Sequence, residues 1–190
     1  MTNSSTQPQE HTMSISTEGS TPTAQNYRAK AAAITTLIAD VTDEQWAAAS
    51  PCEGWSAADV LDHMITTQHD FLTGQGLAAP AEEVSPDRSK RWSRHTAYVA
   101  ELLDDPRVSE HPYDGYFGPT TTGETIAHFY GWDMLAHRYD LGVALGRDPM
   151  LSASELAEIE AALPMFGEAL RAPGICGPVV EVEPDAPHLV

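Results

Sequence analysis

An acid and an imidazole stand four residues apart in the proline-free segment 123–146, GETIAHFYGWDMLAHRYDLGVALG. On a helix Asp133 and His137 share one face, because residues i and i+4 stack one above the other. Ile126 and Leu141 lie on or beside that face, so the pair points toward the buried side. A buried carboxylate is costly unless it is paired, hydrogen-bonded or bound to a metal. The spacing fits a divalent metal shared by Asp133 and His137, an Asp–His hydrogen bond inside a core, or a solvated helix face.

A third candidate ligand, His63, lies on the apolar stripe of another expected helix. Ser56 and Asp59 have the spacing of a helix start, and the helix continues through VLDHMITTQHDFL. His63 is either a satisfied core histidine or a metal ligand. Three N/O ligands from two facing helices, with room left for water, make an open metal site. Zn is the preferred ion for such a site, and Ni or Fe suit the same ligands.

Two further groups stand close to these candidates in the sequence. Asp140 follows His137 by three residues, so it can hydrogen-bond the imidazole and orient it as a ligand. It can equally pair with Arg138 or Arg147. Cys52 precedes the His63 helix, where a helix N-terminus would lower a thiol pKa. A plain structural cysteine is the simpler interpretation of Cys52.

A basic cluster, Arg88, Arg91 and Arg94, begins another expected helix over 87–103. Cations in a first helical turn oppose the helix dipole. These arginines therefore either pair with surface acids or meet an anion. In an enzyme they would be the residues that recognise a substrate carboxylate.

Composition limits the function classes. The 190 residues fit one domain, and ten basic against 28 acidic residues give a net charge of −18. This charge argues against nucleic-acid binding and against an anionic membrane surface, which leaves a small molecule as the expected partner. No apolar run approaches the roughly 18 residues of a membrane span. Two cysteines are too few for a disulfide framework, so we expect a cytoplasmic protein.

The pattern along the chain is mainly helical. Residues 1–24 are polar and predict a disordered tail, and residues 25–190 form the folded domain. Helices are expected over 26–41, 42–49, 56–72, 87–103, 121–146 and 152–170, with a loop over 74–86, an irregular or hairpin segment over 104–119 and a short strand near Val180. The fold class is therefore mainly all-α: an up-and-down four-helix bundle with short additional helices and minor β elements. A helix face is available for a homodimer.

Two motifs resemble a known family. PCEGWSAADVLDHM and DMLAHRYDLGVALGRDP are similar to the paired motifs of the mycothiol-dependent maleylpyruvate isomerase-like proteins, within the DinB superfamily. GPVVEVEPDAP resembles that family's usual ending, and the resemblance covers roughly 27–187. It implies a DinB-like bundle that binds a divalent metal through His63, Asp133 and His137. It also implies mycothiol, the small thiol of actinobacteria, as a possible cosubstrate.

The departures from that family limit what the resemblance implies. Its isomerases more often have Glu where Asp133 stands, and the sequence given ends at Val190 without the further C-terminal domain of the full isomerase. We therefore expect the fold and metal site to carry over and the isomerisation not to. The favoured function is a metal- and thiol-dependent transferase or isomerase acting on a small electrophile. A non-catalytic metal- or ligand-binding protein, and a hydrolase or biosynthetic enzyme that uses metal-bound water without thiol, are the alternatives.

Overall fold

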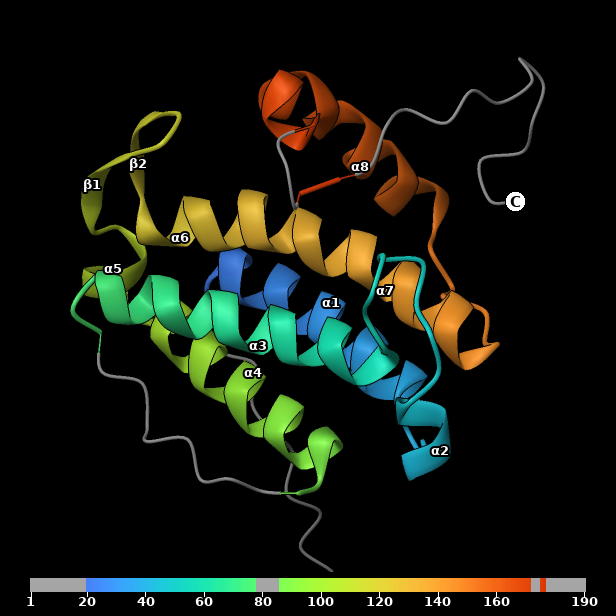
Figure 1. Ribbon diagram of the computed structural model, residues 1–190. Helices are drawn as coiled ribbons and strands as arrows, with labels where there is room; N and C mark the ends of the chain where they lie inside the picture. Colours follow the sequence, from blue (N-terminus) through green and yellow to red (C-terminus); the bar gives the residue numbers. More distant parts are fainter. Residues whose placement is uncertain (1–19, 78–85, 172–174, 177–190) are drawn as a thin grey trace, which may run out of the picture.

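Four long helices form a bundle in the computed structural model, which describes residues 20–77, 86–171 and 175–176. They are α1 (Pro22–Leu37), α3 (Ala57–Gly74), α4 (Arg88–Asp104) and α7 (Gly131–Leu145) (Figure 1). With one two-stranded sheet beside them, this confirms the mainly all-α prediction. The expected strand near Val180, most of the tail and most of the loop over 74–86 lie outside the described residues.

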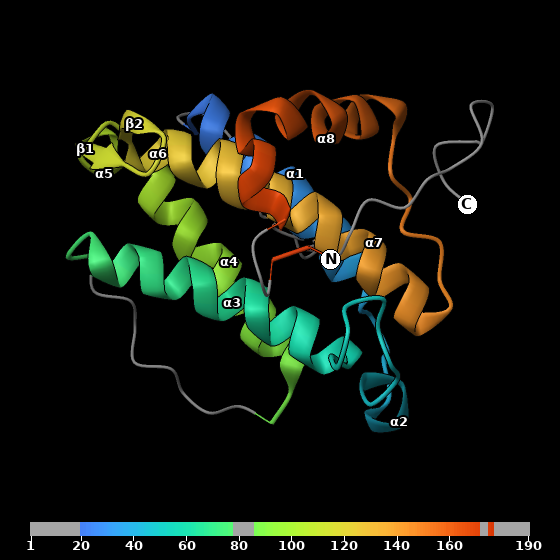
Figure 2. The same cartoon turned by 45° about the horizontal axis from the view of Figure 1, so that its top comes forward.

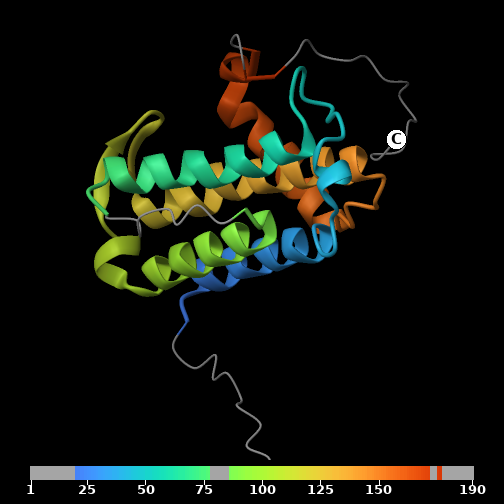
Figure 3. The ribbon, with the colours of Figure 1, turned by 60° about the horizontal axis from the view of Figure 1, so that its bottom comes forward.

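The bundle is built as two layers, with α3 and α7 in one and α1 and α4 in the other (Figure 3). Arg91 binds Asp62 and His95 contacts Gln68, so contacts advance together along α3 and α4 and these two helices are parallel. The order of directions is therefore up, down, down, up rather than strict alternation.

Local start signals in the sequence place most helices correctly. Capping boxes open α3 at Ser56, the short α2 (Asp43–Trp46) at Thr42, and α8 (Ala153–Phe166) at Ser152. In each box the first side chain accepts a backbone N–H that the helix leaves unpaired. After α8 the chain turns into the 3₁₀ segment η2 (Gly167–Arg171), so the α-helix expected to reach residue 170 ends at Phe166.

The first helix begins earlier than its apolar pattern indicates. Thr21 caps α1 and accepts from Ala24 N, and Pro22 takes the first helical position, where no N–H is needed. Ser20 Oγ and Thr21 N both donate to Asp104 Oδ1, at 2.8 and 3.1 Å. Residues 20–24 therefore hold the start of α1 against the end of α4, ahead of residue 25, where the folded domain is predicted to begin.

The segment between α4 and α7 contains a hairpin and an irregular helix. After α5 (Pro106–Ser109), strands β1 (Pro112–Gly115) and β2 (Gly118–Thr121) pair antiparallel. Thr121 then caps α6 (Thr122–Glu124), and the π-helical η1 (Thr125–Tyr130) joins α6 to α7. The expected single α-helix over 121–146 therefore contains a π-helical interruption, a feature that often occurs near functional sites.

The core fills the space between the four long helices. Its fully buried side chains come from all of them and include Ile34, Leu61, Met64, Trp92 and Met134. Helix α8 lies across the outer side of α7 (Figure 2), where Trp132 Nε1 donates to Ile159 O at 3.2 Å. No described helix is both long and apolar enough to cross a membrane. The bundle thus holds α3 and α7 as fixed, facing supports for the candidate ligands.

Candidate metal centre

His63, Asp133 and His137 meet where α3 packs antiparallel on α7 (Figure 1). His63 Nε2 lies 3.7 Å from Asp133 Oδ1, and His137 Nε2 lies 3.4 Å from the same oxygen. One ligand atom from each residue lies within 4.8 Å of the other two. The three residues singled out by spacing in the sequence are therefore brought together.

The donor set and its separations fit a divalent metal. Both N···O distances are longer than a good hydrogen bond of about 2.7–3.2 Å. They suit two ligands of one ion, which lie roughly 3.4 Å apart at tetrahedral angles with bonds of about 2.1 Å. The second oxygen, Asp133 Oδ2, is buried and has no hydrogen-bond partner. A carboxylate left so incompletely bonded is unusual in a purely structural core.

Electrostatics at the site couple the acid and the imidazoles. Burial raises the pKa of Asp133, but the facing imidazoles of His137 and His63 outweigh burial and lower it to about 2. Burial lowers the pKa of His137, yet Asp133, Asp140 and Cys52 outweigh it and raise that pKa to about 12. In the metal-free protein a proton on His137 therefore offsets the Asp133 charge. A metal ion would take that proton's place, since ligating histidines are deprotonated at the metal-binding nitrogen.

Asp140 contacts the other edge of the His137 ring. Its Oδ2 lies 2.9 Å from His137 Nδ1, whereas Arg138 and Arg147 bind other groups. A carboxylate on Nδ1 leaves Nε2 free to face Asp133, as expected of a group that orients a ligand. From the sequence alone, an arginine is an equally good partner for Asp140. When the His137 ring is neutral, its hydrogen bond to Asp140 assigns the remaining proton to Nδ1.

Cys52 also contacts Asp140, the hydrogen-bond partner of His137. The sequence analysis did not predict this contact. Its Sγ donates to Asp140 Oδ2 at 3.3 Å, across 88 positions of the chain. Trp55, from the same turn, lies over the imidazoles, with ring centroids 4.9 Å from His63 and 6.1 Å from His137. The PCEGW stretch was the available signal, but only the packing of its turn against α7 shows what Cys52 contacts.

The contacts described for the other sequence candidates lie outside the triad formed by His63, Asp133 and His137. Arg91 pairs with Asp62 at 2.9 Å, and the Arg88 guanidinium carbon lies 5.8 Å from the centre of the Trp46 ring. Arg94, on the same helix, is exposed. Surface pairing accounts for the contacts of Arg91, and recognition of an anion by this cluster stays a prediction.

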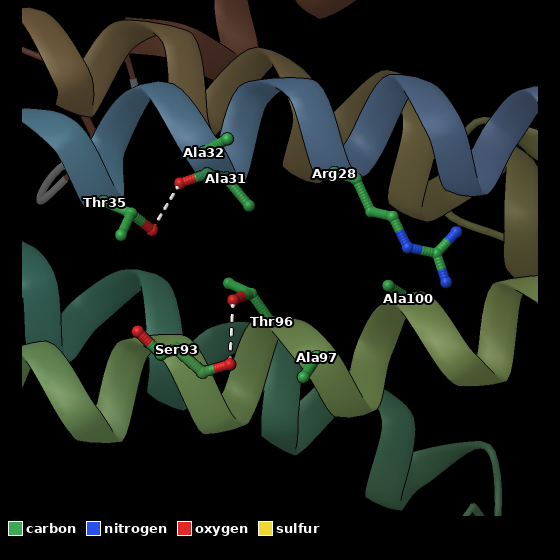
Figure 4. Close-up of a pocket in the computed structure, with 8 residues that line it drawn as sticks. All are labelled: Arg28, Ala31, Ala32, Thr35, Ser93, Thr96, Ala97 and Ala100. Atoms are coloured by element: carbon green, nitrogen blue, oxygen red, sulfur yellow. Dashed lines mark hydrogen bonds between the residues drawn. The ribbon is translucent and has the colours of Figure 1, made fainter. Parts of the chain in front are cut away.

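A hollow of about 260 Å³ lies on another side of the bundle, between α1 and α4 (Figure 4). Alanine, serine and threonine side chains line most of it, and Arg28 at its edge binds Asp104. It contains no imidazole, thiol or carboxylate among its lining residues. We therefore assign the chemistry to the α3–α7 cluster rather than to this hollow.

Comparisons with known proteins find a matching family and two relatives. The uncharacterized proteins MT0763 and Rv0738, from the CDC 1551 / Oshkosh and ATCC 25618 / H37Rv strains of Mycobacterium tuberculosis, are each 28% identical over 148 residues, which cover 75% of this chain and 78% of each relative. No solved structure matches the chain significantly. The model of the mycothiol maleylpyruvate isomerase N-terminal domain matches residues 27–142, a range that contains Cys52 and all three candidate ligands. The chain therefore belongs to the family of the mycothiol maleylpyruvate isomerase N-terminal domain.

Proposed function

We propose that this protein is a metal-dependent transferase or isomerase that uses a low-molecular-weight thiol, mycothiol, to act on a small electrophile. The observation that carries the proposal is the Asp133 carboxylate, which is buried between two imidazoles with one oxygen unbonded. Membership of the mycothiol-related family supports the choice of thiol. Zinc is the preferred metal, because one carboxylate and two imidazoles are common ligands of catalytic zinc.

Each residue of the cluster has a distinct role in this proposal. His63, Asp133 and His137 would hold the metal, which when bound lowers the pKa of a thiol or water so that the nucleophile is anionic near neutral pH. Asp140 holds the proton on His137 Nδ1 and so keeps Nε2 available as a ligand. Trp55 covers one side of the two imidazole rings and would limit water there.

Three arginines at the start of α4 are the candidates for substrate binding. Arg88, Arg91 and Arg94 remain candidates for binding a substrate carboxylate, although Arg91 already pairs with Asp62. Using Arg91 would require exchange of the Asp62 carboxylate for a substrate carboxylate, a contact of similar strength. A substrate without a carboxylate would need none of the three.

The first test is the metal content of the purified protein by mass spectrometry. We expect at least near-stoichiometric metal in the wild type, and loss of the ion held by His63, Asp133 and His137 in His63→Ala and in Asp133→Ala. The matched control is His69→Ala, because His69 lies on the same helix but contacts Asp70 instead of the triad. Wild-type protein that neither carries metal nor takes it up on titration would overturn the metal-dependent function.

The second test separates the three function classes. Consumption of mycothiol is followed with a chromogenic aryl halide as the electrophile, with and without protein, and with His63→Ala. Metal- and His63-dependent loss of thiol supports the transferase. Turnover of an ester probe without thiol favours the hydrolase alternative, and metal binding without any turnover favours a binding protein.

A further inference from the structure

A second set of metal-ligating atoms lies on the opposite edge of the His137 ring from the triad. Cys52 Sγ, Asp140 Oδ2 and one nitrogen of His137 all lie within 4.8 Å of one another. The sulfur is 3.3 Å and His137 Nδ1 is 2.9 Å from the shared carboxylate oxygen. The set differs from the triad in one respect that matters chemically, because it contains a thiol.

These separations are close to those of ligands around one ion. With bonds of about 2.3 Å to sulfur and about 2.0–2.2 Å to nitrogen or oxygen, tetrahedral angles place a sulfur and an oxygen ligand roughly 3.5–3.7 Å apart, and a nitrogen and an oxygen ligand roughly 3.3–3.6 Å apart. The Cys52–Asp140 and His137–Asp140 distances, 3.3 and 2.9 Å, would each have to lengthen by a few tenths of an ångström. The same Asp140 oxygen already meets both other groups, so small side-chain movements would suffice.

The scaffold around the three groups is fixed. His137 and Asp140 are separated by three residues on α7 and therefore lie on one helix face. Cys52 sits in a turn closed by hydrogen bonds from Ser50 N to Trp55 O at 2.9 Å and from Trp55 N to Cys52 O at 3.0 Å. Backbone groups held in this way lose little conformational freedom on binding an ion, which favours affinity.

The charge around His137 also favours a second cation. Within the described part of the chain, neither Asp133 nor Asp140 is contacted by a lysine or arginine, and the nearby Arg138 is committed to Glu155. An ion in the triad would neutralise Asp133 and leave Asp140 facing a neutral imidazole. A second positive charge would balance Asp140 in turn.

We propose that Cys52, Asp140 and Nδ1 of His137 form a second metal site, selective for thiophilic ions such as Zn²⁺ or Cd²⁺. The thiolate gives this site the softer ligand set, whereas the triad offers only nitrogen and oxygen. Binding releases the Cys52 thiol proton and the proton on His137 Nδ1 to solvent. With both sites filled, His137 would offer Nε2 to the ion of the triad and Nδ1 to the second ion.

The test is a Cd²⁺ titration of the full-length protein, followed by the ultraviolet thiolate-to-cadmium charge-transfer band and by ion stoichiometry. We expect the wild type to develop the band and to bind a second Cd²⁺ ion beyond the one in the triad. Cys52→Ser should lose both the band and that ion. Cys176→Ser is the matched control and should keep both, because Cys176 is the exposed free cysteine.

Two more variants separate this proposal from the function proposed above. His63→Ala should lose the triad ion and retain the band, since Cys52, Asp140 and His137 Nδ1 are unchanged. Asp140→Asn should weaken the Cd²⁺ affinity that is read from the band. A wild type without the band, or a band that persists in Cys52→Ser, would overturn the second site and leave the triad untouched.

Discussion

Helix α7 carries buried charge toward α8 and toward α3, and the two sides neutralise it differently. Toward α8, Arg138 is only 1% exposed and donates from Nη2 to Glu155 Oε2 at 2.8 Å. Toward α3, Asp133 faces the imidazoles of His63 and His137, at distances of 3.7 and 3.4 Å. Each side leaves one polar atom unbonded, Arg138 Nε and Asp133 Oδ2. Only the α8 side, however, contains a permanent opposite charge.

The difference separates a structural ion pair from a candidate binding site. Arg138 meets a carboxylate that is itself fixed as the cap of α8, where Ser152 N and Oγ both donate to the same oxygen. The charge on Asp133 is balanced only when an imidazole is protonated or when a cation is present. The first arrangement is complete within the protein, and the second depends on a proton or an ion from solution.

The largest effect is expected on the α8 side. Arg138→Met should lower the free energy of unfolding by about 3 kcal/mol, at the low end for a broken buried pair, because the Glu155 charge that loses its partner is partly exposed. Chemical denaturation measures this loss. Lys90→Met is the control, since Lys90 forms an exposed pair with Asp87 and its removal should change stability by no more than about 0.5 kcal/mol. Equal losses in the two variants would contradict a structural role for Arg138.

The triad should show the opposite behaviour, with stability linked to metal. Zn²⁺ at about 100 times its dissociation constant should raise the wild-type free energy of unfolding by about 2.7 kcal/mol. Asp133→Asn keeps the size of the side chain but removes the anionic ligand. In a Cys52→Ser background, which lacks the thiolate of the second site, we therefore expect no gain from Zn²⁺ in this variant. Denaturation with and without Zn²⁺ measures the gain. A similar gain in Asp133→Asn would show that Zn²⁺ binds elsewhere.

The sequence predicts those features of the two sides of α7 that depend on residue spacing within one helix. The Ser152–Glu155 capping box and the four-residue interval from Asp133 to His137 are properties of one helix. His63 was found because its helix had a clear apolar stripe that had to face the bundle interior. Mainly helical architecture followed from the same periodicity.

Other features depend on how distant segments pack, so they had no local signal. The parallel course of α3 and α4 is set by their contacts, such as Asp62 with Arg91, rather than by the composition of the connection. Cys52 meets Asp140 only because a turn closes onto α7. The π-helix of η1 likewise leaves no pattern distinct from an α-helix in its sequence. Contacts between distant segments depend on the packing of the whole bundle and leave no local pattern in the sequence.

A smaller effect is expected when a supporting group is removed and the triad is left intact. Asp140→Asn should weaken metal binding in the triad by roughly 10–100-fold, because the His137 ring loses the carboxylate that orients it. Competition with a chromophoric chelator measures this affinity. Both proteins, with Asp140 and with Asn at this position, carry Cys52→Ser, so that metal bound by the Cys52 thiolate does not contribute to the measured affinity. An unchanged affinity would limit Asp140 to a packing role.

The smallest effect concerns the pH dependence of the ion pair between α7 and α8. Burial raises the pKa of Glu155, but Arg138 and Ser152 outweigh it and lower that pKa below its ordinary value. A lowered folded-state pKa contributes stability above the unfolded value, and this stability is lost as the pH falls through the folded value. Glu155→Gln keeps a capping oxygen and removes the titration. Its free energy of unfolding should therefore fall less than that of the wild type between about pH 5 and pH 3.

Over this pH interval the wild type should lose a few tenths to about 1 kcal/mol more unfolding free energy than Glu155→Gln. The difference is modest because Glu155 is partly exposed. Glu53→Gln is the control, since Glu53 is exposed and lies in the turn after Cys52. Asp104, whose pKa is lowered to about 2 by Arg28, keeps titrating in every variant and preserves part of the acid slope. If Glu155→Gln and the wild type lose stability in parallel, the Arg138 charge is balanced without Glu155. The α8 side would then resemble the α3 side in needing a partner from solution.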